Sequence, residues 1–330
     1  MKIAIVQLGR IGDLIIVTTA IKMIKQKFPD AKIYFIVGSS NYFVLNNNSE
    51  IEDILIFDKN PLKLLPFLIK LKTLNFDFYI DPKDHYSTES NILAFWVNAK
   101  TKIGFNSAAH KHHFDIGIPN AEQNINLHFV QRIYNALKPI GIDYSNDFQN
   151  IQNLPRPLIY LAEHSLAFVN NFLIDNKIKQ FNLINISASN PSKTWSKTKW
   201  ISFINQLLTS TAEQQFVISS APEHRNIASE IMDNINSNFF VHFPPSAFET
   251  ICALISKANL LISPDTSLIH IAAVFDIPVI SLTNNVPWSI TKFEPLSTYS
   301  KIIIPKNINE VVEDIAIEQV LEAYNKYSAF

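Results

Sequence analysis

The sequence predicts an α/β protein with two doubly wound parallel sheets that face each other across a cleft. Short apolar runs alternate with helix-like segments along nearly the whole chain. The length of 330 residues suits two domains better than one. A polar stretch containing Pro155 and Pro157 interrupts the alternation near the middle. We therefore expect one domain over residues 1–157 and a second over residues 158–330.

The first half starts with an uninterrupted apolar run, which is typical of a strand buried on both faces of a parallel sheet. The same pattern recurs between helix-like segments, so right-handed crossovers place the loops after the strands on one rim. We expect strands at residues 2–8, 32–37, 54–57 and 78–81, and helices at 14–28 and 126–137.

The second half repeats the pattern after the proline-containing stretch. Its last helix, expected over residues 309–327, is placed to pack on either domain, including a return to the first. The expected strands are residues 183–187, 215–219, 239–243, 260–263 and 278–282, and the expected helices are 199–209, 222–234, 248–257 and 267–275.

Composition narrows the class of protein. The formal net charge of −1 offers no basic face for nucleic acid. The single cysteine, Cys252, forms no internal disulfide and favours a reducing compartment. The first apolar run is too short for a signal peptide, and no stretch of 18 apolar residues follows, so we expect a cytoplasmic protein.

One segment is compatible with peripheral contact at the inner face of the membrane. Residues 61–78 mix leucines with Lys63, Lys70 and Lys72, as in a basic amphipathic helix. An ordinary surface helix with one buried face explains the same pattern.

Two of the six glycines lie in the loop Gly9-Arg10-Ile11-Gly12-Asp13, between the first strand and the first helix. Such a loop brings backbone close to a ligand. It lacks the third glycine of the dinucleotide fingerprint, which argues against an oxidoreductase. Asp13, which we expect the helix dipole to keep ionised, suits a general base at the cleft rim. A helix cap is the alternative role for it.

Two polar loops in the second half could bind a diphosphate. Ser187, Ser189 and Lys193 follow its first strand and offer hydroxyls and one positive charge. Asp265 and Thr266 open a later helix, and His270 lies one turn on, on the same face. Helix capping and a hydrogen-bonded core histidine are the alternatives.

We expect no metal and no other cofactor. No Asp-x-Asp pair is present to hold a divalent cation against a diphosphate. The cluster His110-Lys111-His112-His113 has no cysteine or acid spaced to complete a metal site. A basic loop that touches an anionic acceptor and a merely solvated loop both fit this cluster.

An ordered series of segments resembles glycosyltransferase family 9, the heptosyltransferases. The resemblance covers nearly the whole chain. The segments are the opening strand and Gly9–Asp13 loop, Ile103-Gly104-Phe105, His128-Phe129-Val130-Gln131-Arg132, Ser192-Lys193-Thr194-Trp195, Ser220-Ala221-Pro222-Glu223, and Asp265-Thr266-Ser267-Leu268-Ile269-His270.

This resemblance implies two Rossmann-like domains of the GT-B type and an inverting, metal-independent transfer of heptose from ADP-heptose to the anionic inner core of lipopolysaccharide. Asp13 would deprotonate the acceptor hydroxyl. The donor would contact Gly12, Ser187, Ser189, Lys193, Glu223, Asp265, Thr266, Ser267 and His270. The acceptor would contact Arg10, Lys83, Lys111 and His113.

Two departures from the family pattern leave the donor open. Ser267 replaces a glycine, and Asn185-Ile186-Ser187 replaces the usual His-Pro-Gly. A family 9-like transferase with another nucleotide sugar, such as a hexose donor, and a non-catalytic sugar-nucleotide-binding protein are the alternatives. The sequence also leaves the oligomeric state open.

Overall fold

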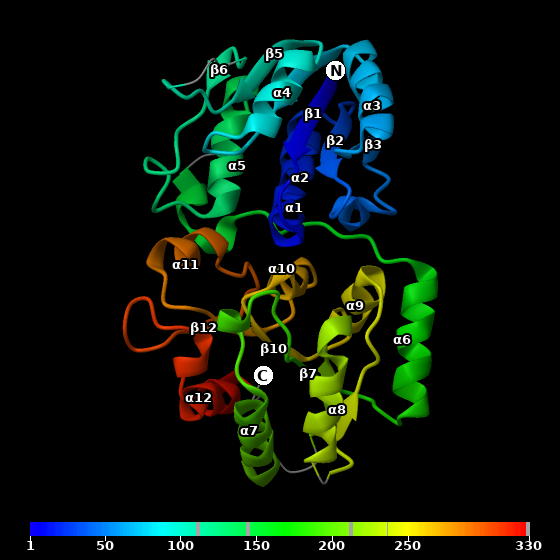
Figure 1. Ribbon diagram of the computed structural model, residues 1–330, viewed down its shortest axis with the longest axis vertical. Helices are drawn as coiled ribbons and strands as arrows, with labels where there is room; N and C mark the ends of the chain where they lie inside the picture. The colour runs from blue at the N-terminus through cyan, green and yellow to red at the C-terminus, as the bar shows by residue number, and fades with distance from the viewer. Residues whose placement is uncertain (110–112, 143–145, 211–213, 236, 328–330) are drawn as a thin grey trace. The chain divides into compact units, whose positions relative to one another are not determined.

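The computed structural model describes residues 1–109, 113–142, 146–210, 214–235 and 237–327. The chain divides into two compact units (Figure 1). The first contains Met1–Tyr160 together with Thr291–Phe293, and the second contains Leu161–Ile290 and Glu294–Phe330. A short piece from late in the sequence therefore belongs to the first unit.

The first unit is built on one parallel sheet. Its strands are β1 (Lys2–Gln7), β2 (Lys32–Gly38), β3 (Ile51–Phe57), β4 (Phe76–Ile80), β5 (Ala99–Gly104) and β6 (Ile116–Gly117). Its helices are α1 (Ile11–Val17), α2 (Thr19–Lys27), α3 (Pro61–Thr73), α4 (Thr88–Trp96) and α5 (Phe129–Leu137). Across the described residues the strand order is β3-β2-β1-β4-β5-β6, and all pairs are parallel.

Helices cover both faces of this sheet. Along β1, Ala4 and Val6 belong to a core cluster that also contains Phe67 and Leu71 of α3 and Leu93 of α4. Side chains alternate along a strand, so the neighbouring buried residues of β1 point to the opposite face. Burial on both faces explains why β1 reads as a continuous apolar run.

The second unit repeats this architecture. Its strands are β7 (Asn182–Asn185), β8 (Phe216–Ser219), β9 (Phe240–His242), β10 (Leu260–Pro264), β11 (Val279–Leu282) and β12 (Ser300–Ile303). Its helices are α6 (Glu163–Asp175), α7 (Lys197–Ser210), α8 (Arg225–Asp233), α9 (Phe248–Ile255), α10 (Ser267–Val274), α11 (Pro287–Phe293) and α12 (Ile317–Tyr327), although the last three residues of α11 belong to the first unit. The described strands run in the order β12-β11-β10-β7-β8-β9, again all parallel.

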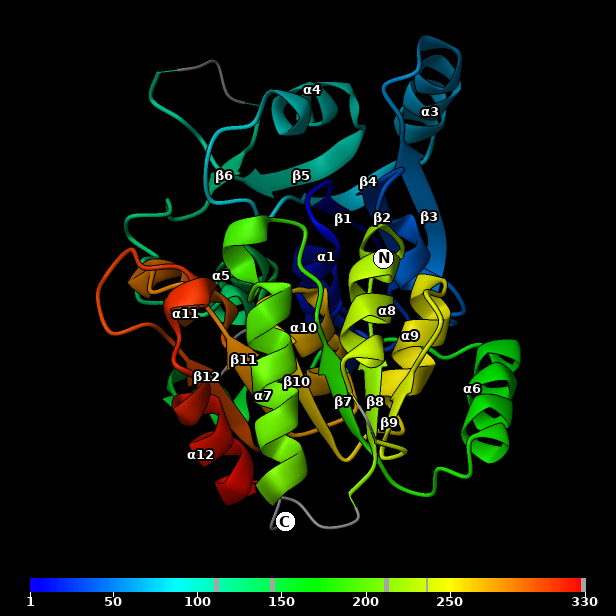
Figure 2. The ribbon, with the colours of Figure 1, turned by 60° about the horizontal axis from the view of Figure 1, so that its bottom comes forward.

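The predicted fold class of two Rossmann-like parallel-sheet domains is confirmed by these two sheets. Counted from its own first strand, each sheet has the order 3-2-1-4-5-6, which is that of dinucleotide-binding folds. In Figure 2, α7 and α12 lie side by side on one face of the second sheet.

The structure divides one predicted helix and places the last one. The expected helix 14–28 is divided at Thr18, whose hydroxyl donates to the Ile15 carbonyl at 2.6 Å and accepts from the Leu158 N–H at 2.7 Å. The C-terminal helix packs within the second unit, which is one of the two placements that the sequence left open. There its Tyr324 hydroxyl accepts from Asn182 at 3.1 Å and donates to Gln214 at 2.8 Å.

The described part of the chain contains no helix that combines the length and the apolar character needed to cross a membrane.

Candidate active site

Each sheet reverses its strand order between two central strands. In the first sheet these are β1 and β4, and in the second they are β7 and β10. The chain leaves the two strands toward opposite edges, so the loops at their carboxyl ends diverge and leave room for a ligand. Most of the predicted site residues follow these four strands: Arg10, Gly12 and Asp13 after β1, Lys83 after β4, Ser187, Ser189 and Lys193 after β7, and Asp265, Thr266, Ser267 and His270 after β10.

The loop after β1 is held close to the Asp13 carboxylate. A Cβ on Gly9 would lie 3.0 Å from Asp13 Oδ2 and 2.9 Å from Gln7 Oε1, so a larger residue here would displace these two side-chain oxygens. Asn41, which is fully buried, donates to the carbonyls of Gln7 at 3.2 Å and Gly9 at 2.8 Å. The glycine therefore serves local packing at the carboxylate.

Asp13 is the third residue of α1, and Arg10 occupies the N-cap. The Asp13 carboxylate accepts a hydrogen bond from the Arg10 backbone N–H. Asp13 therefore does cap the helix start, but from the third helical position and not from the N-cap position itself. Burial raises the pKa of Asp13, and the charges of Lys292, Arg10 and Lys83 offset only part of this effect. The Asp13 carboxylate is thus a stronger base than an exposed carboxylate. The sequence alone predicts instead that the helix dipole, which favours the ionised form, has the larger effect on its pKa.

Lys292 is a site residue that the sequence did not indicate. It belongs to the three-residue piece that joins the first unit, and its ammonium lies 5.0 Å from the centre of the Phe129 ring. Burial lowers the pKa of Lys292, and the nearby charges of Asp84 and Asp13 oppose that shift. Because 279 residues of sequence separate it from Asp13, no local pattern could have revealed it.

A buried ion pair fixes the loop after β4. Arg132 of α5 contacts Asp84 at 2.5 Å, and both side chains are nearly inaccessible to solvent. Burial acts to raise the pKa of Asp84, but Lys292 and the hydrogen bonds from Arg132 and His85 outweigh it and hold the pKa below its usual range. This pair explains why a polar arginine stands in the apolar α5.

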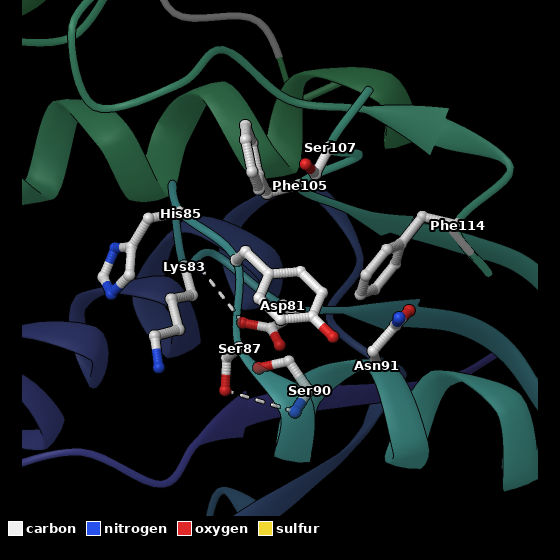
Figure 3. Close-up of a pocket in the computed structure, with 10 residues that line it drawn as sticks. Asp81, Lys83, His85, Ser87, Ser90, Asn91, Phe105, Ser107 and Phe114 are labelled. Carbon is white, nitrogen blue, oxygen red and sulfur yellow. Dashed lines mark hydrogen bonds between the residues drawn. The ribbon is translucent and has the colours of Figure 1, made fainter. Parts of the chain in front are cut away.

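The remaining predicted acceptor residues are dispersed. Arg10 is exposed at the start of α1, and Lys83 lines a pocket after β4 together with Asp81 (Figure 3). The His113 ring packs against Phe95 of α4, with ring centres 5.2 Å apart. Lys111 lies outside the described residues.

In the second unit, the Lys193 ammonium contacts Asp265 Oδ2 at 2.7 Å. Lys193 ends a short 3₁₀ turn after β7, and the next residues run extended. Trp195 is therefore directed into the core, where its indole N–H donates to the Ile315 carbonyl at 3.2 Å. In the Lys-x-Trp segment, buried Trp195 thus anchors the loop, and partly exposed Lys193 presents its charge at the carboxyl-end edge of the sheet.

The serines after β7 have different environments. Ser187 is buried, and its hydroxyl accepts from the Ala221 N–H at 2.9 Å, so it ties this loop to the loop after β8. Ser189 is exposed and available to a ligand. Glu223 is exposed in the 3₁₀ turn Pro222–His224 after β8. Ser187 therefore supports the loop in this structure. The sequence pattern alone could not distinguish this supporting role from ligand binding.

The start of α10 follows Asp265 and so lies beside the Lys193–Asp265 pair. Thr266 is the N-cap, and its hydroxyl accepts from the Leu268 N–H at 3.3 Å. Ser267 is the first helical residue. Burial lowers the pKa of His270 to about 4, so its ring is neutral at pH 7. A helix start with a lysine beside it suits a diphosphate.

Known proteins match this architecture. Residues 66–318 match glycosyltransferase family 9 (heptosyltransferase). This range is more than half of the sequence. The chain belongs to glycosyltransferase family 9. It is therefore a glycosyltransferase, as the resemblance predicted.

The relatives extend over both units. The lipopolysaccharide core heptosyltransferase OpsX of Haemophilus influenzae is 24% identical over 292 residues, which cover 85% of this chain and 78% of OpsX. A family 9 glycosyltransferase structure from Veillonella parvula has a TM-score of 0.80 at 15% identity, covering 99% of this chain and 96% of that one. The E. coli heptosyltransferase WaaC with ADP-2-deoxy-2-fluoro heptose has a TM-score of 0.73 at 18% identity, covering 99% of both chains.

The described residues of this family 9 chain contain no cluster of three or more His, Cys, Asp or Glu side chains placed to hold a metal ion. The positive charges near the two switch points come from lysine and arginine.

Proposed function

We propose that this family 9 glycosyltransferase transfers heptose from ADP-heptose to the inner core of lipopolysaccharide, with inversion and without a metal. The observation that carries the proposal is the location of Asp13 and of the Lys193–Asp265 pair at the switch points of the two sheets. The names of the relatives, which include a lipopolysaccharide core heptosyltransferase and a complex with an ADP-heptose analogue, support the donor and acceptor.

Asp13 is the general base in this proposal. Its carboxylate takes the proton of an acceptor hydroxyl, and the hydroxyl oxygen attacks the anomeric carbon as the bond to the diphosphate breaks. ADP leaves with the bonding electrons, so the configuration at the anomeric carbon is inverted. The raised pKa of Asp13 makes its carboxylate a better proton acceptor than an exposed one.

The second unit stabilises the leaving diphosphate. Lys193 supplies a positive charge, and the start of α10 at Thr266 and Ser267 supplies the positive end of a helix dipole. Asp265, which already orients Lys193, is placed to accept hydrogen bonds from the donor sugar. Neutral His270 adds no competing charge. Exposed Ser189 and Glu223 complete the donor contacts.

Thermal unfolding in the presence of a panel of nucleotides and nucleotide sugars tests the donor assignment without an acceptor. ADP and ADP-heptose are expected to raise the melting temperature more than UDP, GDP, CMP or NAD, because a ligand that binds only the folded state stabilises it by mass action. Lys193→Met should weaken ADP binding by about tenfold or more, since a charge-assisted contact is lost. Lys301→Met, an exposed change on β12, is the matched control.

Each other result of the panel has a definite meaning. Preference for UDP or GDP sugars reassigns the donor, with Ser267 as the first residue to revert to glycine. Absence of binding by every nucleotide would contradict the transferase proposal, whereas binding of a nucleotide sugar without transfer to any acceptor would support the non-catalytic alternative.

The charges around Asp13 predict a pH dependence. Transfer should fall as the pH drops through the raised pKa of Asp13, because only the ionised carboxylate accepts a proton. Lys292 favours the ionised form, so Lys292→Met should raise this pKa further and move the acid limb of kcat/KM to higher pH. Lys292→Arg should keep the limb in place, and Lys326→Met is the remote control. An unmoved limb in Lys292→Met would contradict the electrostatic link.

We also propose that the enzyme acts at the cytoplasmic face of the membrane, through α3 and α4. Leu62, Leu65 and Ile69 are 85%, 63% and 58% exposed, although the opposite side of α3 is buried in the core. Ile92, Phe95 and Trp96 form a second exposed apolar stripe on neighbouring α4. Because α3 is apolar on both sides, we expect a second apolar environment, here the lipid, to cover its exposed side.

Three lysines of α3 lie near this surface, but only Lys72 contributes to the proposed attraction to anionic lipid. Lys72 lies 5.8 Å from the centre of the Trp96 ring, an arrangement suited to the membrane interface. Lys63 and Lys70 are paired with Asp58 and Asp53. We therefore assign most of the attraction to the apolar stripes rather than to charge.

Vesicle co-sedimentation distinguishes these contributions. Leu62→Gln with Leu65→Gln and Ile69→Gln should reduce binding to phosphatidylglycerol-containing vesicles by about tenfold or more, because exposed apolar area drives insertion at the interface. The control is Ile174→Gln with Ile308→Gln, which removes equally exposed side chains from the second unit. Equal loss in both variants, or none in the first, would refute a specific surface.

A further inference from the structure

A buried polar side chain, Asn185, ends β7 at the switch point of the second sheet. It is only 3% exposed. β7 and β10 are neighbours in this sheet, and Ile184 lies opposite Ile262, so Asn185 is level with Ser263 (Figure 2). A buried amide needs partners for its two N–H groups and its oxygen, so those partners show which parts of the chain it holds together.

The Asn185 amide joins the loop after β7 to the end of β10. Its Oδ1 accepts from the Ser187 N–H at 3.1 Å, and its Nδ2 donates to the Ser187 carbonyl at 2.9 Å. The same nitrogen donates to Ser263 Oγ at 3.0 Å. Both N–H groups and the oxygen of the amide are therefore used, and one side chain connects the two strands that diverge at the switch point.

Ser263 extends this connection to the start of α10. Its hydroxyl donates to the Pro264 carbonyl at 2.8 Å. A hydroxyl carries one proton and two lone pairs, so the lone pairs of Ser263 accept from Asn185 and from the Thr266 hydroxyl, which lies 3.4 Å away. The Thr266 hydroxyl in turn accepts from the Leu268 N–H. A continuous series of hydrogen bonds therefore runs from β7 to the cap of α10.

We propose that Asn185 is a positioning residue for the donor diphosphate, because it fixes the loop that carries Lys193 relative to the loop that carries Asp265. Asn185 acts through these loops and does not itself contact the substrate. This role rests on the transferase function proposed above, in which the two loops hold the leaving group.

The same hydrogen bonds give two of the predicted diphosphate ligands a supporting role. Asn185 holds both backbone groups of Ser187, whose hydroxyl accepts from the Ala221 N–H. The Thr266 hydroxyl is directed to Ser263 and to the helix cap. The direct phosphate contacts therefore fall to the remaining predicted residues of these loops, which are Ser189, Lys193 and Ser267.

This arrangement also accounts for a departure from the family pattern. Where that pattern has His-Pro-Gly, this chain has Asn185-Ile186-Ser187. Proline would restrain the loop through its fixed φ angle, and it has no N–H to donate. Here the Ile186 N–H donates to the Ser219 carbonyl of β8 at 3.2 Å, and Asn185 holds the next residue. Hydrogen bonds thus supply the restraint that the proline would give.

A general contribution to folding is the alternative role for Asn185, and Asn182 provides the matched comparison. Asn182 lies three residues earlier on β7 and is 2% exposed. Its amide donates to the Tyr324 hydroxyl of α12 at 3.1 Å, at the amino end of the strand. Replacement of either amide removes a buried hydrogen bond, but only replacement of Asn185 releases the loops at the carboxyl end.

Titration calorimetry with ADP tests the proposal. Asn185→Ala should weaken ADP binding by about tenfold or more, because Lys193 and the start of α10 are no longer held in one geometry. Asn182→Ala should lower the melting temperature but leave the affinity for ADP unchanged. Wild-type affinity in Asn185→Ala, or equal loss of affinity in both variants, would overturn the proposal.

Ser263→Ala is a milder second variant, because it removes the connection to α10 and leaves Asn185 bonded to Ser187. It should also weaken ADP binding. The double variant Asn185→Ala with Ser263→Ala should lose less affinity, on a logarithmic scale, than the sum of the two single losses, since both changes break the same connection. Additive losses would show that the two residues act separately and would contradict the proposed connection.

Amide hydrogen exchange without any ligand separates this inference from the transferase function. Asn185→Ala should speed exchange of the Leu268 N–H several-fold, and Asn182→Ala should leave it unchanged. If exchange speeds up in this way but the wild type binds no nucleotide, the connection between the loops stands and the transferase proposal fails. Unchanged exchange at Leu268 in Asn185→Ala overturns the connection itself.

Discussion

The reversal of strand order at the centre of each sheet is the constraint on which the site depends. Parallel strands joined by right-handed crossovers leave their carboxyl ends on one edge, and only between β1 and β4, or β7 and β10, do the following loops diverge. Polar groups can collect there without interrupting the apolar interior. Asp13, in the first turn of α1, and Lys193, in the 3₁₀ turn after β7, both follow the first strand of their unit.

Charge balance shapes the first of these positions. Asp13 and Asp84 are carboxylates in a partly buried setting, and Lys292, Lys83 and Arg132 offset them. The ion pair of Arg132 with Asp84 is nearly inaccessible to solvent, so its energetic value lies mainly in holding the loop after β4 in one geometry. Lys292 completes the balance from a distant part of the sequence. The pKa of the proposed base, Asp13, therefore depends on neighbours that are distant in the sequence.

The sequence predicted the sheets well because continuous apolar strands and glycine-containing loops are local properties. The same reasoning placed Asp13, Lys193 and Asp265 at strand ends. It could not predict the break at Thr18, whose hydroxyl accepts a hydrogen bond from the Leu158 N–H far along the chain. Nor could it separate buried Ser187, which braces a neighbouring loop, from exposed Ser189. Lys292 was missed because its significance comes from tertiary burial.

The central claim is that Asp13 acts as the base for glycosyl transfer, and a single-turnover assay of Asp13→Asn tests it most directly. ADP-heptose and an inner-core acceptor would be mixed with excess enzyme, and donor affinity measured in parallel. The account predicts a fall in transfer rate of about 10²–10⁴ with donor affinity unchanged, because only the proton acceptor is lost. Transfer at the wild-type rate would contradict it.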